Sequence, residues 1–298
     1  MTTDADRPAA ASPGTRLRWL LEGPRALVLP GAADPLTARL AVGAGFEAVY
    51  ATGAGIANSL LGVPDVGLTT MTEVVDQVAR IVAAVEVPIV ADIDTGFGNA
   101  INARRAVVEF ERAGVAAIQI EDQVFPKRCG HFNGKEIIPL PEMLAKLRAV
   151  LEARRDLSLV VIARTDALAV DGFEAAVERG RAFAEAGADV VFIEAPTDAD
   201  QLAALPGLVP VPLLANMVEG ARTPLHGATE LEAMGYRIVL FANTAMRVGA
   251  RAVRDAFAEL RATGDSRGLQ DRMLSWDDRQ ALVGLPEIEA LEARYRVE

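Results

Sequence analysis

Short aliphatic runs alternate with longer amphipathic stretches along most of this chain. The amphipathic stretches, such as residues 102–113 and 173–186, have the apolar spacing of a helix that packs on one face. Continuous apolar runs between them are typical of strands in a parallel sheet that is covered by helices on both faces. Eight such runs occur, at residues 26–30, 48–51, 88–92, 116–121, 159–163, 190–194, 212–216 and 237–241.

Eight strand–helix units predict a (β/α)8 barrel of the TIM type. The alternative is a doubly wound parallel sheet, which is disfavoured because the Gly-x-Gly-x-x-Gly fingerprint is missing after the first run. We expect a mobile tail over residues 1–14 and a catalytic barrel over residues 15–263. Residues 264–298 exceed what eight units need, and they predict a helical extension with helices over 269–274 and 286–295. Such an extension could cap the barrel or pack on a neighbouring subunit.

Charge and composition restrict the possible partners. The formal net charge is −11 and the pI is about 4.9, which argues against nucleic acids and anionic membrane surfaces. A small anionic substrate would need local Arg, Lys or metal charge. No apolar run approaches the ~20 residues that span a bilayer, and the N-terminus lacks a basic region followed by an apolar one. With Cys129 as the only cysteine, these features predict a cytoplasmic protein.

Polar side chains follow the predicted strands where each strand ends. In a barrel these ends converge on one face, so residues distant in sequence become neighbours. Clustered carboxylates repel one another unless a cation neutralises them, and oxygen ligands without histidine favour Mg²⁺ or Mn²⁺. A helix-capping role for Asp92 alone is an equally good interpretation, but it explains the whole set poorly. The set is Asp92, Asp94, Glu121, Asp122, Arg164, Asp166, Glu194 and Asn216.

Two loops complete the candidate chemistry. The first contains Cys129 beside Lys127, Arg128 and His131, and this positive environment favours a thiol that exchanges protons near neutral pH. A small buried cysteine is the alternative, which the charged neighbours disfavour, and nothing marks a cysteine protease. The second loop follows Tyr50 and offers a hydroxyl and a glycine-lined turn to a carboxylate, although taken alone it is better explained as an ordinary glycine-rich turn.

These stretches together resemble the isocitrate lyase and phosphoenolpyruvate mutase superfamily, in particular its short members. The resemblance covers roughly residues 17–261. It is carried by YATGAG from Tyr50, DIDTGFGN from Asp92, QIEDQ from Gln119, PKRCGH from Pro126, IARTD from Ile162 and LANMVE from Leu214.

The resemblance implies roles for particular residues. It implies Mg²⁺ held by Asp92 and Asp94, with Glu121 as a direct or water-mediated ligand. It implies Cys129 as the proton donor on a gating loop, assisted by Lys127, His131, Arg164 and Glu121. It also implies exchange of a terminal helix between subunits, in a homodimer or homotetramer. The implied substrate-binding residues are Tyr50, Thr52, Gly53, Ala54, Asp65, Gly130, Arg164, Glu194 and Asn216.

The activity implied is Mg²⁺-dependent carbon–carbon cleavage of a 2-hydroxy di- or tricarboxylate, like methylisocitrate or dimethylmalate, into a 2-oxo acid and a carboxylate. The alternatives are a phosphonomutase of the carboxyphosphonoenolpyruvate mutase type, an oxaloacetate hydrolase, and a barrel without catalysis, which the intact acids disfavour. Two departures leave the substrate open. The chain has Phe241-Ala242-Asn243 where the family commonly has Tyr-Pro, and Phe132 follows His131 where methylisocitrate lyases tend to have arginine.

Overall fold

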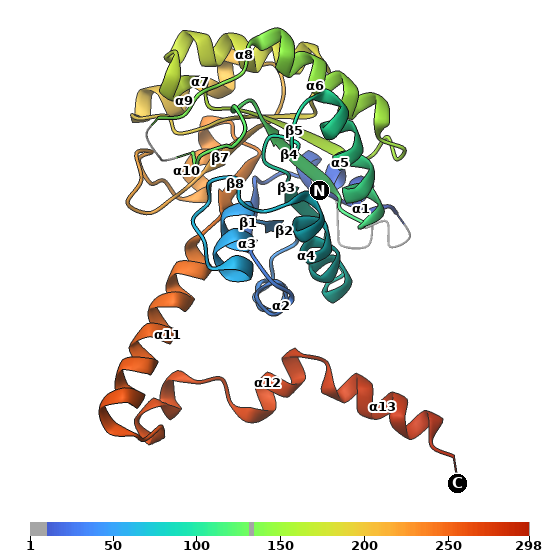
Figure 1. Ribbon diagram of the computed structural model, residues 1–298, viewed down its shortest axis with the longest axis vertical. Helices are drawn as coiled ribbons and strands as arrows, with labels where there is room; N and C mark the ends of the chain where they lie inside the picture. Colours follow the sequence, from blue (N-terminus) through green and yellow to red (C-terminus); the bar gives the residue numbers. More distant parts are fainter. Residues whose placement is uncertain (1–10, 131–133, 298) are drawn as a thin grey trace.

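A closed barrel of parallel strands forms the centre of the computed structural model, which describes residues 11–130 and 134–297 (Figure 1). In these residues eight strands pair in sequence order, and the last closes on the first. The predicted barrel is therefore confirmed and the doubly wound sheet is excluded. Each strand lies within two residues of a predicted run. The strands are β1 (Leu27–Ala32), β2 (Val49–Ala51), β3 (Ile89–Asp92), β4 (Ala117–Glu121), β5 (Val160–Thr165), β6 (Val190–Ile193), β7 (Leu213–Asn216) and β8 (Ile238–Phe241).

The strand residues alternate between two apolar clusters. One cluster, with Val161 and Val191, packs between the strands and the surrounding helices, while the other, with Ile162 and Val190, fills the barrel interior. Because both faces of the sheet are buried, the strand sequences are apolar throughout rather than alternating. Along most strands this inner series changes from apolar to polar, as in Val160, Ile162 and Arg164 of β5. The period of two thus carries polar side chains to the inside of the barrel only at its C-terminal end.

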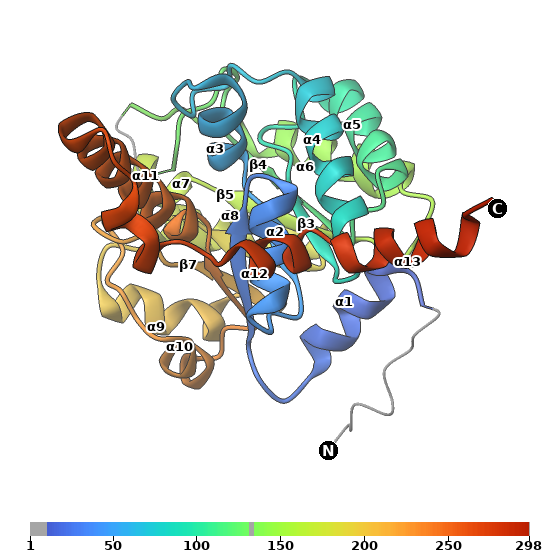
Figure 2. The ribbon, with the colours of Figure 1, turned by 90° about the horizontal axis from the view of Figure 1, so that it is seen from below.

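Helices cover the outside of this barrel. Local caps explain where two of them begin: Thr70 and Asn99 each form a capping box with the backbone and side chain three residues later. Helix α1 closes the opposite end of the barrel, where Leu17 is fully buried in the interior cluster (Figure 2). The covering elements are α1 (Pro13–Glu22), α2 (Pro35–Gly43), α3 (Gly53–Ile56), η2 (Ala57–Leu61), α4 (Met71–Ala84), α5 (Ala100–Arg112), α6 (Leu140–Ala153), α7 (Ala167–Val170), α8 (Phe173–Glu185), α9 (Ala199–Leu208) and α10 (Ala228–Met234).

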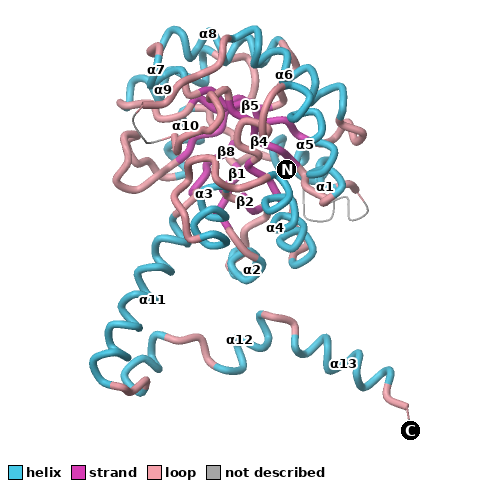
Figure 3. Tube along the Cα trace, viewed as in Figure 1, coloured by secondary structure: helices cyan, strands magenta, loops and turns pink. Residues whose placement is uncertain are grey.

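The helix after β8 leaves the barrel. Helix α11 (Thr244–Thr263) projects away from it, and η3 (Arg267–Arg272), α12 (Trp276–Leu282) and α13 (Leu285–Tyr295) follow as an extended arm (Figures 1 and 3). None of the described residues in α11, α12 or α13 is buried. Only limited contacts, such as Arg39 Nη1 donating to the carbonyl of Leu282 at 3.1 Å, join the arm to the barrel.

The terminal predictions were partly wrong. The helix predicted over 269–274 is instead a 3-10 helix that ends at Arg272, and Met273 after it is extended. The sequence interpretation missed α12, which begins because Ser275 accepts a hydrogen bond from the N–H of Asp278 at 3.0 Å. The helix predicted over 286–295 is α13. At the other end α1 begins at Pro13, inside the predicted tail, whose residues 1–10 lie outside the described residues.

No helix in residues 11–130 and 134–297 is both long and apolar enough to cross a lipid bilayer.

Candidate active site

A small cavity opens among the C-terminal ends of the strands, where the sequence predicted the site. Its volume is only about 40 Å³, because the loop after β4 lies across its mouth. The cavity wall contains most of the predicted site residues. These are Tyr50, Thr52, Ala54, Asp65, Asp92, Lys127, Cys129, Gly130, Arg164, Glu194 and Asn216. Of the remaining predictions, His131 lies outside the described residues.

Asp92, Asp94 and Gly53 meet on one side of this cavity. Asp94 has a left-handed backbone (φ 50°), which aspartate tolerates better than most residues, and its N–H donates to Asp92 Oδ1 at 3.0 Å. A Cβ atom added to Gly53 would lie 2.9 Å from Asp92 Oδ2 and 3.3 Å from Asp94 Oδ1. Oxygen atoms of the two carboxylates therefore border the same small space beside Gly53. A side chain at position 53 would fill this space. On the neighbouring strand, Glu121 Oε1 is buried without a hydrogen-bond partner among the described residues.

Burial and one ammonium group determine the charge of these acids. Burial raises the pKa of Asp94 to about 6, although the Lys127 ammonium opposes the shift, with Nζ 2.8 Å from Asp94 Oδ1. Burial also raises the pKa of Glu121 well above its usual range. For Lys127, burial alone would lower the pKa, but Asp94, Glu121 and Asp65 outweigh it and raise the pKa well above its usual value. The acids around Lys127 thus favour its charged form.

These residues fit Mg²⁺ bound through few protein ligands. A cation would relieve the desolvated negative charge of Asp94 and Glu121, and the Oε1 atom of Glu121 has a vacant acceptor position. Among the described residues, no three His, Cys, Asp or Glu side chains converge into a complete metal cage. Mg²⁺ commonly takes one or two carboxylates and fills its other positions with water or substrate oxygens, so the arrangement is compatible with that ion.

Arg164 is a buried guanidinium held by several acids. Its Nε lies 2.9 Å from Asp166 Oδ2 and 3.3 Å from Glu121 Oε2, and its Nη1 lies 3.9 Å from Glu194 Oε2. Its guanidinium carbon also stacks 5.1 Å from the ring centroid of Phe192. Burial opposes its charge, but the acids raise the pKa of Arg164 well above its usual value. Arg164 therefore places a fixed positive charge at the cavity wall.

Acids at the strand ends are not equivalent. Asp122 follows Glu121 and points to the other face of β4, where it accepts hydrogen bonds from Thr165 Oγ1 (2.7 Å) and Arg179 Nη1 (3.0 Å). Its carboxylate also accepts from the N–H of Asp166 at 2.9 Å. Asp122 joins strand ends to the middle of helix α8 outside the cavity, so it is neither a helix cap nor a member of the common site.

Hydrogen bonds hold the loop after β4 at Cys129 and at the residue before it. Gln123 donates to the carbonyl of Arg128 at 2.8 Å and accepts from its N–H at 2.9 Å, while the N–H of Cys129 donates to the carbonyl of Asp65 at 3.2 Å. The Arg128 side chain is exposed, and only its neighbours Lys127, Cys129 and Gly130 line the cavity. The loop thus presents a thiol, rather than the adjacent guanidinium, to the site.

Several residues in or near the site were not among the predicted site residues, although the stretch with Ala242 and Asn243 was noted as a departure from the family. Asn243 follows β8 at the N-cap position of α11, yet its side chain caps no helix N–H; its Oδ1 is buried without a hydrogen-bond partner among the described residues. It lines the cavity with Val218, Leu240 and Ala242. Gln119 was missed although it accepts from Tyr50 Oη at 2.6 Å. The period-two alternation of β4, which places Gln119 and Glu121 on the same face, could have revealed it.

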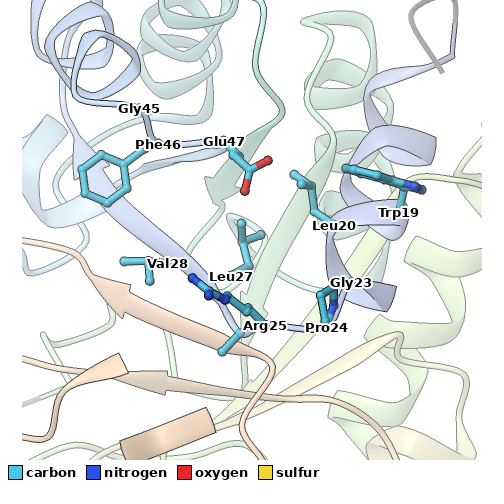
Figure 4. Close-up of a pocket in the computed structure, with 11 residues that line it drawn as sticks. Trp19, Leu20, Gly23, Pro24, Arg25, Leu27, Val28, Gly45, Phe46 and Glu47 are labelled. Carbon is cyan, nitrogen blue, oxygen red and sulfur yellow. The ribbon is translucent and has the colours of Figure 1, made fainter. Parts of the chain in front are cut away.

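A larger pocket of about 510 Å³ lies at the opposite end of the barrel, between α1 and the start of β1 (Figure 4). Trp19, Leu20 and Phe46 form much of its wall, and Arg25 and Glu47 are its charged residues. It contains no group of carboxylates and no cysteine, and the N-terminal end of a barrel is the end where stability rather than catalysis is usually found. The small cavity is therefore the candidate active site.

The barrel and its acidic, thiol-bearing mouth define an enzyme of the (β/α)8 class. A family model described as phosphoenolpyruvate phosphomutase matches residues 17–261. The chain is 45% identical to the 2,3-dimethylmalate lyase of Eubacterium barkeri over 94% of this chain and 97% of the relative. It is 43% identical to the 2-methylisocitrate lyase of Aeropyrum pernix over 94% and 90%. This chain belongs to the phosphoenolpyruvate mutase and isocitrate lyase superfamily, as the sequence predicted, and it is an enzyme of the lyase type.

Solved structures agree with this assignment. A crystal structure of 2,3-dimethylmalate lyase superposes with a TM-score of 0.90 at 38% identity, covering 95% of both chains. An oxaloacetate acetylhydrolase with the inhibitor 3,3-difluorooxalacetate has a TM-score of 0.91 at 35% identity, covering 97% of this chain and 98% of that one. A phosphonopyruvate hydrolase in complex with oxalate and Mg²⁺ has a TM-score of 0.86 at 35% identity, covering 96% and 99%.

Proposed function

We propose that this enzyme cleaves a carbon–carbon bond of a small 2-hydroxy di- or tricarboxylate, of the dimethylmalate or methylisocitrate type, to give a 2-oxo acid and a second carboxylate. The observation that carries the proposal is the placement of the Cys129 loop across a cavity that also contains Asp92 and Arg164. A proton donor, a metal-binding acid and a carboxylate-binding cation then face one small ligand.

The residues divide the work as follows. Asp92 and Asp94, with Glu121, would hold Mg²⁺, which supplies Lewis-acid stabilisation to the carboxylate and 2-oxygen of the substrate. The turn at Thr52, Gly53 and Ala54 would bind the same 2-oxo-acid end. Arg164 would orient a carboxylate, and Asn216 would contact the part of the substrate that leaves.

Cleavage requires one proton to leave oxygen and one to reach carbon. The hydroxyl loses its proton as the carbon–oxygen double bond of the 2-oxo acid forms, and the carbon–carbon bond electrons pass to the departing carboxylate fragment. The unpartnered Oε1 of Glu121 supports this residue, acting through a water, as the base. The Cys129 thiol would then protonate the carbanion, while the loop over the cavity keeps water from doing so.

A substrate panel tests the proposal. Purified protein with Mg²⁺ is incubated with 2,3-dimethylmalate, 2-methylisocitrate, oxaloacetate and carboxyphosphonoenolpyruvate, and products are identified by NMR. We expect a 2-oxo acid from one of the first two. Hydrolysis of oxaloacetate alone, or rearrangement of the phosphonate alone, would refute the lyase. Repeating the assay with Asp94→Asn across a Mg²⁺ titration should show a metal requirement raised at least tenfold, and an unchanged requirement would refute the ligand assignment.

The assembly is also part of the proposal. Helix α11 exposes Val248, Val253 and Phe257, whose side chains are 65%, 53% and 66% exposed, and α12 exposes Trp276. Apolar surface on this scale favours a covering partner. We propose that a second copy of the chain covers it, in a homodimer or homotetramer that exchanges these helices, and that the enzyme works in the cytoplasm. Sedimentation should show no monomer at micromolar concentration, and a monomeric species would refute the exchange.

A further inference from the structure

Lysine is rare in this chain and always buried. The sequence has only three lysines against 27 arginines, and the lysines are 4%, 8% and 2% exposed at Lys127, Lys135 and Lys146. Lys127 neutralises the acids of the cavity, and Lys146 donates to the carbonyl of Thr95 at 3.1 Å. Lys135 has no place in the mechanism above, although its ammonium is buried close to the site. A buried charge is costly unless its partners compensate for it, so its contacts require an explanation.

The contacts of Lys135 connect two parts of the active site. Its Nζ donates to the carbonyl of Gly130 at 2.5 Å and to Asp166 Oδ1 at 2.6 Å. Asp166 in turn accepts from Arg164, at 2.9 Å from Nε and 3.2 Å from Nη2. The lysine and aspartate side chains are 2% and 0% exposed, so neither contact is screened by water. An uninterrupted series of hydrogen bonds thus runs from the carbonyl of Gly130, the residue after Cys129, to the guanidinium of Arg164.

We propose that Lys135 is a positioning residue that sets the Cys129–Gly130 backbone at a fixed height above Arg164. It does not line the cavity and acts only through these two neighbours. Gly130 rests directly on the substrate-facing side chains, because a Cβ atom placed there would lie 2.8 Å from Glu194 Cγ and Oε1. Van der Waals contact with Glu194 prevents Gly130 from moving closer to the barrel, and the hydrogen bond from Lys135 prevents its carbonyl from moving away. The two interactions together fix the position of the Cys129 thiol.

An ammonium suits this position better than a guanidinium. Lys135 must point its donors at a carbonyl and a carboxylate on different segments from a pocket enclosed on all sides, and a compact point charge with rotatable donors can do so. The planar guanidinium of an arginine would bind the Asp166 carboxylate with two parallel hydrogen bonds and leave the Gly130 carbonyl without a donor. Buried ion pairs contribute little to stability relative to an apolar replacement, so the placement of this one beside the reacting groups is the more informative property.

The inference rests on the proposed lyase reaction, and its test uses a substrate that the unaltered enzyme cleaves. Lys135→Met and Lys135→Gln remove the ammonium while Asp166 and Glu121 continue to hold Arg164. We expect kcat to fall about 30- to 100-fold with less than a threefold change in KM, because binding survives and proton delivery does not. Arg154→Met is the matched control. It breaks a partly buried pair with Asp189 (3.0 Å) near the N-terminal ends of the strands, and should lower the melting temperature without changing kcat.

Stereochemistry separates positioning from a general structural effect. In D₂O the thiol of the unaltered enzyme should deliver deuterium to one face of the carbanion, giving a single enantiomer of the α-deuterated carboxylate. The Lys135 variants should give a mixture, since solvent reaches a carbanion whose donor is displaced. A folded variant with unchanged kcat, or with reduced kcat and one enantiomer, would overturn the role of Lys135. An unaltered enzyme that cleaves neither hydroxy acid would instead overturn the proposed reaction.

Discussion

A single methyl group at Gly130 should test the geometry of the whole site. In Gly130→Ala the new Cβ would lie 2.8 Å from Glu194 Cγ, whereas ordinary van der Waals contacts begin near 3.4 Å, and it would also overlap Arg164 Nη2. Both neighbours are buried and held by charge, so the loop rather than the barrel must move, by roughly 0.6 Å or more. Displacements approaching 1 Å in a catalytic arrangement can cost about 100-fold in rate. That loss corresponds to about 2.7 kcal/mol in the activation barrier.

The assay is steady-state cleavage by Gly130→Ala beside a thermal unfolding scan. We expect the loss in kcat and a melting temperature close to that of the unaltered enzyme, because the loop contributes little to the core. Gly43→Ala is the control: a Cβ there meets nothing within 4 Å, and alanine should stabilise α2 by up to ~1 kcal/mol without altering kcat. A Gly130→Ala enzyme with kcat within twofold of the original would show that the loop does not stand over the substrate as described.

Three further changes address other parts of the molecule. Cys129→Ser should keep substrate binding and lose 100-fold or more in kcat, measured by single-turnover cleavage, since a hydroxyl is a far weaker acid; near-normal cleavage would exclude the thiol as donor. Burial alone would raise the pKa of Asp166, but Arg164 and Lys135 lower it from 3.8 to about 2. Asp166 therefore stabilises the fold above pH 4 by about 2 kcal/mol, and this is lost as the pH falls towards 2. Urea unfolding of Asp166→Asn should show this deficit at pH 7 and about half of it at pH 3, and a deficit independent of pH would contradict the pairing. Phe257→Asp should dissociate the assembly in sedimentation experiments, whereas an intact oligomer would place the interface elsewhere.

The barrel was predictable because its signals are local and repeated. Every strand is a mainly apolar run, and on most strands a polar residue stands at the C-terminal end, so the fold and the convergence of Asp92, Glu121 and Arg164 follow from the pattern. The resemblance added roles that spacing alone could not supply, above all the position of Cys129 over the cavity.

The features that the sequence did not reveal depend on the direction in which a side chain points and on contacts between residues far apart in the sequence. Glu121 and Asp122 are neighbouring carboxylates that point to opposite faces, and only the strand register separates the site residue from the structural one. Lys135 looks like an ordinary loop lysine until Asp166 is brought against it from another strand. The outward course of α11 could not be predicted either, because its apolar residues have helical spacing whether they cover the barrel or a neighbour.

The absence of exposed lysine has a practical consequence. Because Lys127, Lys135 and Lys146 are all buried, acylating reagents that target side-chain amines have no ready site on the folded chain. Two of the three amines lie in or beside the loop over the active site, so their acylation requires that the loop leave the barrel. Mass spectrometry can measure how fast an amine-reactive label is incorporated at these positions, with and without oxalate. This rate therefore measures how often the active site opens. The chain reports its own loop motion without an introduced probe.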